Sequence, residues 1–229
     1  MKAGIVGLPN VGKSTLFNCL SNSKAQSANF PFCTIEPNHS IINVPDKRLM
    51  ALEEIVKPEK VIPATVEIVD IAGLVKGASK GEGLGNKFLA NIRETDAIIH
   101  VLRCFDNDNI THVDGSVDPV RDKEIIDIEL QLKDLESLNN RIEKVKRTAK
   151  SGDKEAIHEK EILQKAIEFI ESSNNIRSIE LDTLEIDKYL KPLQLITSKP
   201  VLYVCNVDDV GCSKNANPKT DINNIEINQ

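Results

Sequence analysis

The stretch Gly7-Leu8-Pro9-Asn10-Val11-Gly12-Lys13-Ser14-Thr15 decides the fold of this chain, because it fits the phosphate-binding loop pattern G-x-x-x-x-G-K-[ST]. The apolar run from Ala3 to Val6 predicts a buried strand before it, and the residues from Thr15 to Leu20 alternate at helical spacing after it. In this arrangement backbone N–H groups and the positive end of the helix dipole converge on phosphate oxygens. The alternative is a chance match in a Gly-rich turn, and both flanks disfavour it.

Two side chains of this loop and a second motif complete the predicted phosphate site. We expect Lys13 to contact the outer phosphates and to act as a catalytic residue there. We expect the Ser14 hydroxyl to ligate Mg²⁺. The motif Asp70-Ile71-Ala72-Gly73 follows a β-branched strand predicted over Ala64–Val69. Asp70 is expected to hold the magnesium ion through a water molecule, and the Gly73 N–H to bind the terminal phosphate. The alternative for this motif is a plain turn that ends the strand.

The composition excludes several classes of protein. The 229 residues carry a net charge of −6, which argues against a surface coated in positive charge for indiscriminate nucleic-acid binding. Aromatic residues make up 3% and there is no Trp, so a base-stacking platform for single strands is not expected. The five cysteines form no C-x-x-C pair, which favours free thiols in a reducing cytosol. Because no apolar run approaches about 18 residues, we predict a soluble cytoplasmic protein without a membrane span.

Strand-like and helix-like patterns alternate along the first half of the chain. Strands beyond the first are predicted at His39–Val44, Ala64–Val69, Ala97–Leu102 and Pro200–Cys205. Helices are predicted at Lys13–Ser21, Asp46–Val56 and Asn86–Glu94. Strands that alternate with helices predict an α/β fold with a parallel sheet.

From Pro119 the pattern changes to one long apolar stripe. Its members recur at spacings of three and four residues, as Leu132, Leu135, Leu138 and Ile142 do. Gly152 marks a break, after which a second stripe begins, so we predict an antiparallel, coiled-coil-like helical hairpin inserted in the α/β domain. The expected division is an α/β domain from residues 1–118 and 196–209, the hairpin at 119–195, and a disordered tail at 210–229.

Two further segments fall in the order in which GTPase-like enzymes place their nucleotide contacts. Thr34 lies in the loop after the first helix, where a threonine contacts Mg²⁺ and closes over the γ-phosphate. Asn206-Val207-Asp208-Asp209 follows the last strand, at the place of the N-K-x-D tetrad that selects guanine. Val207 replaces the lysine of that tetrad, so the guanine-selecting device is incomplete and adenine could be accepted. A plain loop residue and a surface turn are the respective alternatives.

Three strings together resemble the YchF / Obg-like ATPase family over about residues 1–209. They are GLPNVGKS at 7–14, NFPFCTIEPN at 29–38, and VDIAGLVKGA with GEGLGN between residues 69 and 86. The resemblance implies an Obg-related P-loop NTPase with a GTPase-like sheet, an inserted coiled-coil hairpin and a following C-terminal TGS domain. It implies Mg²⁺-dependent hydrolysis of ATP, often in preference to GTP, and association with ribosomes.

The same resemblance assigns residues to the site. Nucleotide binding maps onto Asn10, Val11, Gly12, Lys13, Ser14 and Thr15, and base recognition onto Asn206, Val207 and Asp209. Magnesium maps onto Ser14 and Thr34.

The residue after Gly73 bears on the mechanism of hydrolysis. It is Leu74, whereas many GTPases place a water-orienting glutamine there, so another group must position the water. Our candidate is His112, in the loop from Asp106 to Gly115, because a neutral imidazole can orient water near pH 7. The alternative is an ordinary histidine of a surface loop.

The tip of the predicted hairpin is basic in an otherwise acidic chain. Five cations lie within ten residues that contain one acid, Glu143, and they are candidates for contact with ribosomal RNA phosphates: Arg141, Lys144, Lys146, Arg147 and Lys150. The alternative is a solvated helix end.

The resemblance stops after Asp209. No remaining strand, final helix or TGS domain is recognisable in residues 210–229, so the chain is expected to be truncated, with weaker nucleotide binding and lower stability than an intact relative. A non-catalytic ribosome- or RNA-binding module and an inactive remnant therefore stay open beside the NTP hydrolase. The preferred base and the oligomeric state stay open as well.

Overall fold

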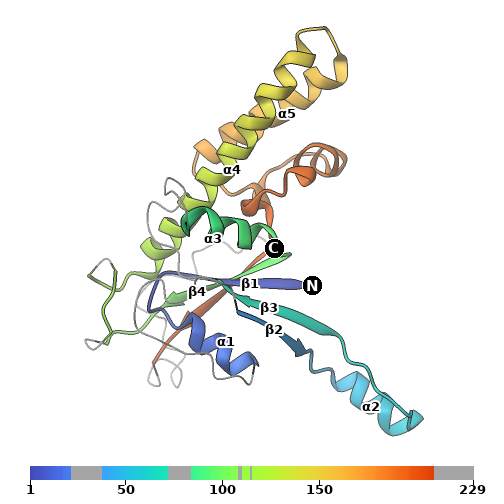
Figure 1. Ribbon diagram of the computed structural model, residues 1–229, viewed down its shortest axis with the longest axis vertical. Coiled ribbons are helices and arrows are strands. Elements are labelled where there is room, and N and C mark those ends of the chain that lie inside the picture. Colours follow the sequence, from blue (N-terminus) through green and yellow to red (C-terminus); the bar gives the residue numbers. More distant parts are fainter. Residues whose placement is uncertain (22–37, 72–83, 108–109, 114, 209–229) are drawn as a thin grey trace.

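A computed structural model describes residues 1–21, 38–71, 84–107, 110–113 and 115–208 of the chain. Its centre is a five-stranded sheet with the strand order β2-β3-β1-β4-β5 (Figure 1). The strands are β1 Lys2–Val6, β2 Asn38–Asn43, β3 Thr65–Asp70, β4 Ala97–Arg103 and β5 Val201–Asn206. Every predicted strand is present, within about one residue of its expected bounds.

The expectation of a parallel sheet holds for four strands and is wrong for β2. Strands β1, β3, β4 and β5 pair in parallel, whereas β2 runs antiparallel to β3. The helix between them, α2 Lys47–Val56, buries none of its residues, and Met50 and Ile55 are 63% and 78% exposed. Because this helix does not pack across the sheet, it cannot serve as a crossover, and the chain simply turns back beside β3.

The main core lies between the sheet and the helices on its two sides. Figure 1 shows α1 Lys13–Ser21 below the sheet, and α3 Leu84–Arg93 with the lower part of α4 above it. Phe17 of α1 and Leu89 of α3 are buried in the same cluster as the inner residues of β1. This packing holds the loop between β1 and α1 at the carboxyl edge of the sheet.

The predicted hairpin consists of α4 Pro119–Ala149 and α5 Lys154–Glu171 (Figure 1). The side chains of Asp118 and Asp153 cap the two helices by accepting hydrogen bonds from Arg121 N and Ala156 N. The hairpin has a core of its own around Leu138 and Leu163, whereas the first half of α4 shares the core of the sheet. Helix α4 therefore contributes to both hydrophobic clusters. The division into domains expected from the sequence stays a prediction.

Five short helical turns lead from α5 back to β5. They are η1 Ile176–Ser178, α6 Thr183–Glu185, η2 Ile186–Leu190, η3 Lys191–Leu193 and η4 Ile196–Ser198. Asp134 of α4 is fully buried and holds the last turn, because its carboxylate accepts bonds from Ile196 N at 2.8 Å, Thr197 N at 2.7 Å and Thr197 Oγ1 at 2.8 Å. The helix thereby fixes where β5 enters the sheet.

Two further expectations concern the C-terminal tail and a membrane span. The tail predicted at residues 210–229 lies outside the described residues. Among the helices that are described, none is long and apolar enough to cross a lipid bilayer.

Candidate nucleotide-binding site

The loop between β1 and α1 has a backbone that side chains would obstruct. Gly7 and Gly12 have φ angles of 152° and 102°, and Asn10 has a φ of 63°. A Cβ atom on Gly7 would lie 2.6 Å from the carbonyl oxygen of Val101, and one on Gly12 would lie 2.5 Å from Asn206 Nδ2. Glycine is therefore required at both positions, which explains the two fixed glycines of the motif.

Lys13 is the buried cation of the site. The residue is 7% exposed, and its Nζ donates a hydrogen bond to the carbonyl oxygen of Leu8 at 3.0 Å. Burial lowers the pKa of this ammonium to about 8, against the charge of Asp70, which raises it. A phosphate group placed here would meet a cation with little competing solvent.

Ser14 and Asp70, predicted from separate motifs, meet at the carboxyl edge of the sheet. Ser14 Oγ donates to Asp70 Oδ2 at 3.0 Å, since the parallel pairing of β1 with β3 brings Asp70 beside Ile5 at the start of the loop. Burial raises the pKa of Asp70, and the bond from Ser14 and the charge of Lys13 both lower it. A hydroxyl and one carboxylate fit Mg²⁺, which takes few protein oxygens where phosphates supply the others.

Asn206 touches the phosphate loop directly, which the sequence analysis did not foresee. Its Nδ2 donates to the carbonyl oxygen of Val11 at 3.0 Å, across 195 positions of sequence. The residue predicted to read the base therefore also supports the loop. Of the other predicted contacts, Val207 follows β5, whereas Thr34, Gly73 and Asp209 lie outside the described residues.

His112 lies in a loop that contacts both the phosphate loop and helix α4. Asn10 Nδ2 donates to the carbonyl oxygen of Thr111 at 3.2 Å, which ties this loop to the phosphate loop. His112 is 9% exposed, and its Nε2 lies 2.9 Å from Asp122 Oδ2 on α4. The alternative of an ordinary surface histidine is thus wrong, although its role with water stays a prediction.

Arg103 organises the same loop, and sequence reasoning missed it. The guanidinium is buried at the end of β4 and donates to the carbonyl oxygens of Phe105, Ile110 and Asn107 at 3.2, 3.0 and 3.1 Å. A charged residue at the end of an apolar strand was the available signal, because a buried guanidinium requires several acceptors.

The basic hairpin tip is partly neutralised by its own acids. Arg141 Nε lies 2.6 Å from Glu159 Oε1, and Lys146 Nζ lies 2.5 Å from Glu143 Oε1. Lys144, Arg147 and Lys150 are exposed. Contact with RNA stays a prediction for all five cations.

Comparisons with known proteins agree with this geometry. The family described as "50S ribosome-binding GTPase" matches residues 2–141. The ribosome-binding ATPase YchF of Haemophilus influenzae is 55% identical over 214 residues, which are 93% of this chain and 59% of that protein. The Bacillus subtilis protein of the same name is 57% identical over 209 residues, with 91% and 57% covered.

A solved structure extends the likeness to the fold. The structure of the Schizosaccharomyces pombe YchF GTPase superposes with a TM-score of 0.75 at 40% identity, covering 93% of this chain and 58% of that one. The chain thus spans a little under three-fifths of the length of these relatives. With the phosphate loop and the Ser14–Asp70 pair in place, these matches show that the chain belongs to the 50S ribosome-binding GTPase family and is homologous to the YchF ATPases, as its motifs predict.

Proposed function

We propose that this chain is a Mg²⁺-dependent NTP hydrolase that prefers ATP and acts as a slow, ribosome-associated switch in the cytoplasm. The observation that carries the proposal is the meeting of a buried lysine, a hydroxyl and a carboxylate at the carboxyl edge of the sheet. Three residues from two separate motifs converge there, and they are the groups that phosphoryl transfer uses.

The protein contributes charge and position rather than covalent chemistry. Lys13 would exchange its bond to the Leu8 carbonyl for the outer phosphate oxygens, and the amides of the loop would bind the oxygens behind them. Ser14, Asp70 and Thr34 would hold Mg²⁺, which neutralises the charge that develops on the phosphates. Ser14 and Asp70 already lie together at the edge of the sheet, so these two groups need little reorganisation at the transition state.

We assign the positioning of water to His112. Its imidazole is held by Asp122, a carboxylate partner that fixes the orientation of the ring. The loop that carries it is joined to the phosphate loop through Asn10, so the ring is tied to the place where phosphates would bind. An apolar Leu74 in the usual position of the water-orienting glutamine requires a substitute of this kind.

The proposed preference for ATP rests on the end of β5. Asn206 is engaged with the phosphate loop, and Val207 has no group that hydrogen-bonds a base edge or extends along it as a lysine does. A guanine would therefore lose part of the contact that selects it in GTPases.

The proposed association with the ribosome draws on the relatives, two of which are named ribosome-binding ATPases. The exposed cations of the hairpin tip are the part of this chain suited to ribosomal RNA phosphates. This observation also favours the second candidate function, a module that binds the ribosome and only senses nucleotide.

Phosphate release separates the two functions. We would measure it with ATP and with GTP, with and without Mg²⁺, on the chain and on Lys13→Ala. The hydrolase predicts Mg²⁺-dependent release that is faster with ATP and is lost in the variant. Binding of triphosphate without release favours the sensing module, and equal release from Lys13→Ala contradicts the proposed site.

A further inference from the structure

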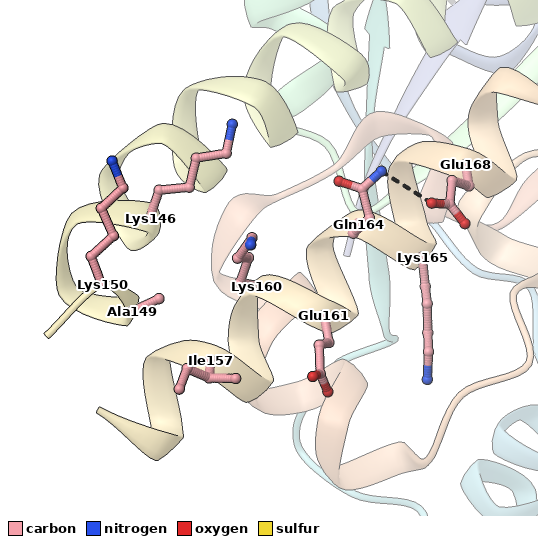
Figure 2. A pocket seen from close by; sticks show the side chains of 9 residues that line it. All are labelled: Lys146, Ala149, Lys150, Ile157, Lys160, Glu161, Gln164, Lys165 and Glu168. Carbon is pink, nitrogen blue, oxygen red and sulfur yellow. Dashed lines mark hydrogen bonds between the residues drawn. The ribbon is translucent and has the colours of Figure 1, made fainter. Parts of the chain in front are cut away.

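The two hairpin helices enclose a groove with a volume of about 670 Å³ near their free end. Figure 2 shows Lys146 and Lys150 extending from α4 and Lys160 facing them from α5, with Lys165 further along α5. The apolar residues Ala149 and Ile157 also line the groove, and Ile157 is 40% exposed. Four lysines from two helices thus surround a small apolar surface.

Three of the four groove lysines have no acidic partner among the residues described. Within the described part of the chain, Lys150, Lys160 and Lys165 form no salt bridge within 4.0 Å, and Lys146 is paired with Glu143. Outside the groove, Arg141 is paired with Glu159, whereas Lys144 and Arg147 beside the groove also form no salt bridge among the described residues. The groove and the adjoining face of α4 therefore carry positive charge that no described acid within 4.0 Å offsets.

The two acids of the groove do not cancel this charge. Glu168 accepts a hydrogen bond from Gln164 Nε2 at 3.1 Å, which Figure 2 shows as a dashed line. Glu161 lies 3.9 Å from His158 Nδ1, on its own helix. The lining has four lysines against two glutamates, in a chain whose net charge is −6.

We propose that this groove binds the sugar–phosphate backbone of an RNA single strand, without reading its bases. Lysines are flexible point charges that suit phosphate, and Lys150 and Lys160 reach the groove from opposite helices. The groove lining contains no aromatic ring, so bases have nothing to stack on, while Ala149 and Ile157 offer an apolar surface to ribose.

The inference rests on the proposed ribosome association and sharpens it. The sequence placed the RNA-contact candidates on α4 alone, whereas the groove adds Lys160 and Lys165 of α5 and omits the paired Arg141. An acidic peptide has the same charge as RNA but lacks ribose, so competition by such a peptide separates the two ligands.

The test uses the full chain and fluorescent polyuridylate of about 20 nucleotides, in a series of salt concentrations. The double variant Lys160→Gln with Lys165→Gln should bind more weakly, and its salt slope should fall by about 1.4, since each phosphate contact on a single strand contributes about 0.7. The matched control is Lys47→Gln with Lys60→Gln, which changes the net charge equally at exposed positions of the α2 region. The control should keep the slope of the parent chain.

Equal losses in the two double variants would overturn the inference, because binding would then follow net charge alone. Polyglutamate that competes as strongly as polyuridylate would overturn it as well. Co-sedimentation with 50S subunits tests the proposed ribosome association separately. If the parent chain sediments with them and the groove variant does so equally, the groove is refuted while the association stands. If the parent chain does not sediment with them, the proposed ribosome association is wrong. Binding of polyuridylate by the two double variants then tests the groove by itself.

Discussion

Binding of a nucleotide should be coupled to the uptake of a proton by Lys13. Burial lowers the pKa of this side chain to about 8, so about half of the molecules carry a neutral amine at pH 8. A triphosphate binds the ammonium form and raises its pKa, so binding at pH 8 should take up about half a proton. Between pH 7 and pH 9 the protonated fraction falls about tenfold, and the affinity should fall by about the same factor.

The same pKa shift has a cost for the protein without nucleotide. A lysine whose pKa is lower in the folded than in the unfolded state destabilises the fold as pH falls from 10.5 towards 8, and by a constant amount below that. A shift from 10.5 to about 8 corresponds to about 3 kcal/mol at neutral pH. Phosphate oxygens would relieve this cost, which makes the site favour an anionic ligand.

Isothermal titration with a non-hydrolysable ATP analogue and excess Mg²⁺ measures the coupling. The apparent binding enthalpy in two buffers of different ionisation enthalpy gives the number of protons taken up. Lys13→Arg is the control, because its guanidinium stays charged over this range and its affinity should not vary with pH. Normal binding by the parent chain with no proton uptake at pH 8 would refute the reasoning.

Three further substitutions test other parts of the structure. His112→Ala should slow phosphate release strongly and leave nucleotide affinity unchanged; equal turnover would remove His112 from the mechanism. Burial lowers the pKa of His100 to about 4, so below pH 6.5 the unfolded state binds a proton more readily than the folded state. The free energy of unfolding therefore falls as pH drops from 6.5 towards 4, by about 3 kcal/mol at pH 4. His100→Leu should flatten that part of the pH profile in urea unfolding, and parallel profiles would argue against it. Asp134→Ala should lower the free energy of unfolding by about 3 kcal/mol, because it leaves the buried donors of Ile196 and Thr197 without an acceptor; a loss below about 1 kcal/mol in urea unfolding would show that water replaces the carboxylate.

The parts of this fold that the sequence predicted are those encoded by neighbouring residues. The phosphate loop needs its two glycines for reasons of local backbone geometry, and the buried strands are continuous apolar runs. The orientation of β2 was missed because it depends on whether α2 packs on the sheet. Its apolar residues gave a helical pattern, but a pattern cannot say whether the face it creates finds a partner.

The hydrogen bonds that join the parts of the site could not be predicted from local sequence patterns, for a different reason. The bond from Asn206 to Val11 and the three bonds to Asp134 link residues that are 195 and about 63 positions apart. Such bonds exist because burial forces each polar group to find an acceptor or donor, and the fold decides which one is near. The residue types could be recognised as polar in apolar surroundings, but their partners could not.

Helix α4 connects the hairpin to the site through two carboxylates. Asp122 in its first turn holds the imidazole of His112, and Asp134 three turns later holds the turn that leads into β5 and Asn206. The helix then continues without a break to Lys146 at the groove. Continuity alone does not transmit a signal, because a rigid helix has only one arrangement and coupling requires an element with two. In the arrangement that the structure describes, Asp122 holds His112 while Ile126 and Leu130 are buried in the core of the sheet, so α4 supports the site as a fixed element and not as a switch.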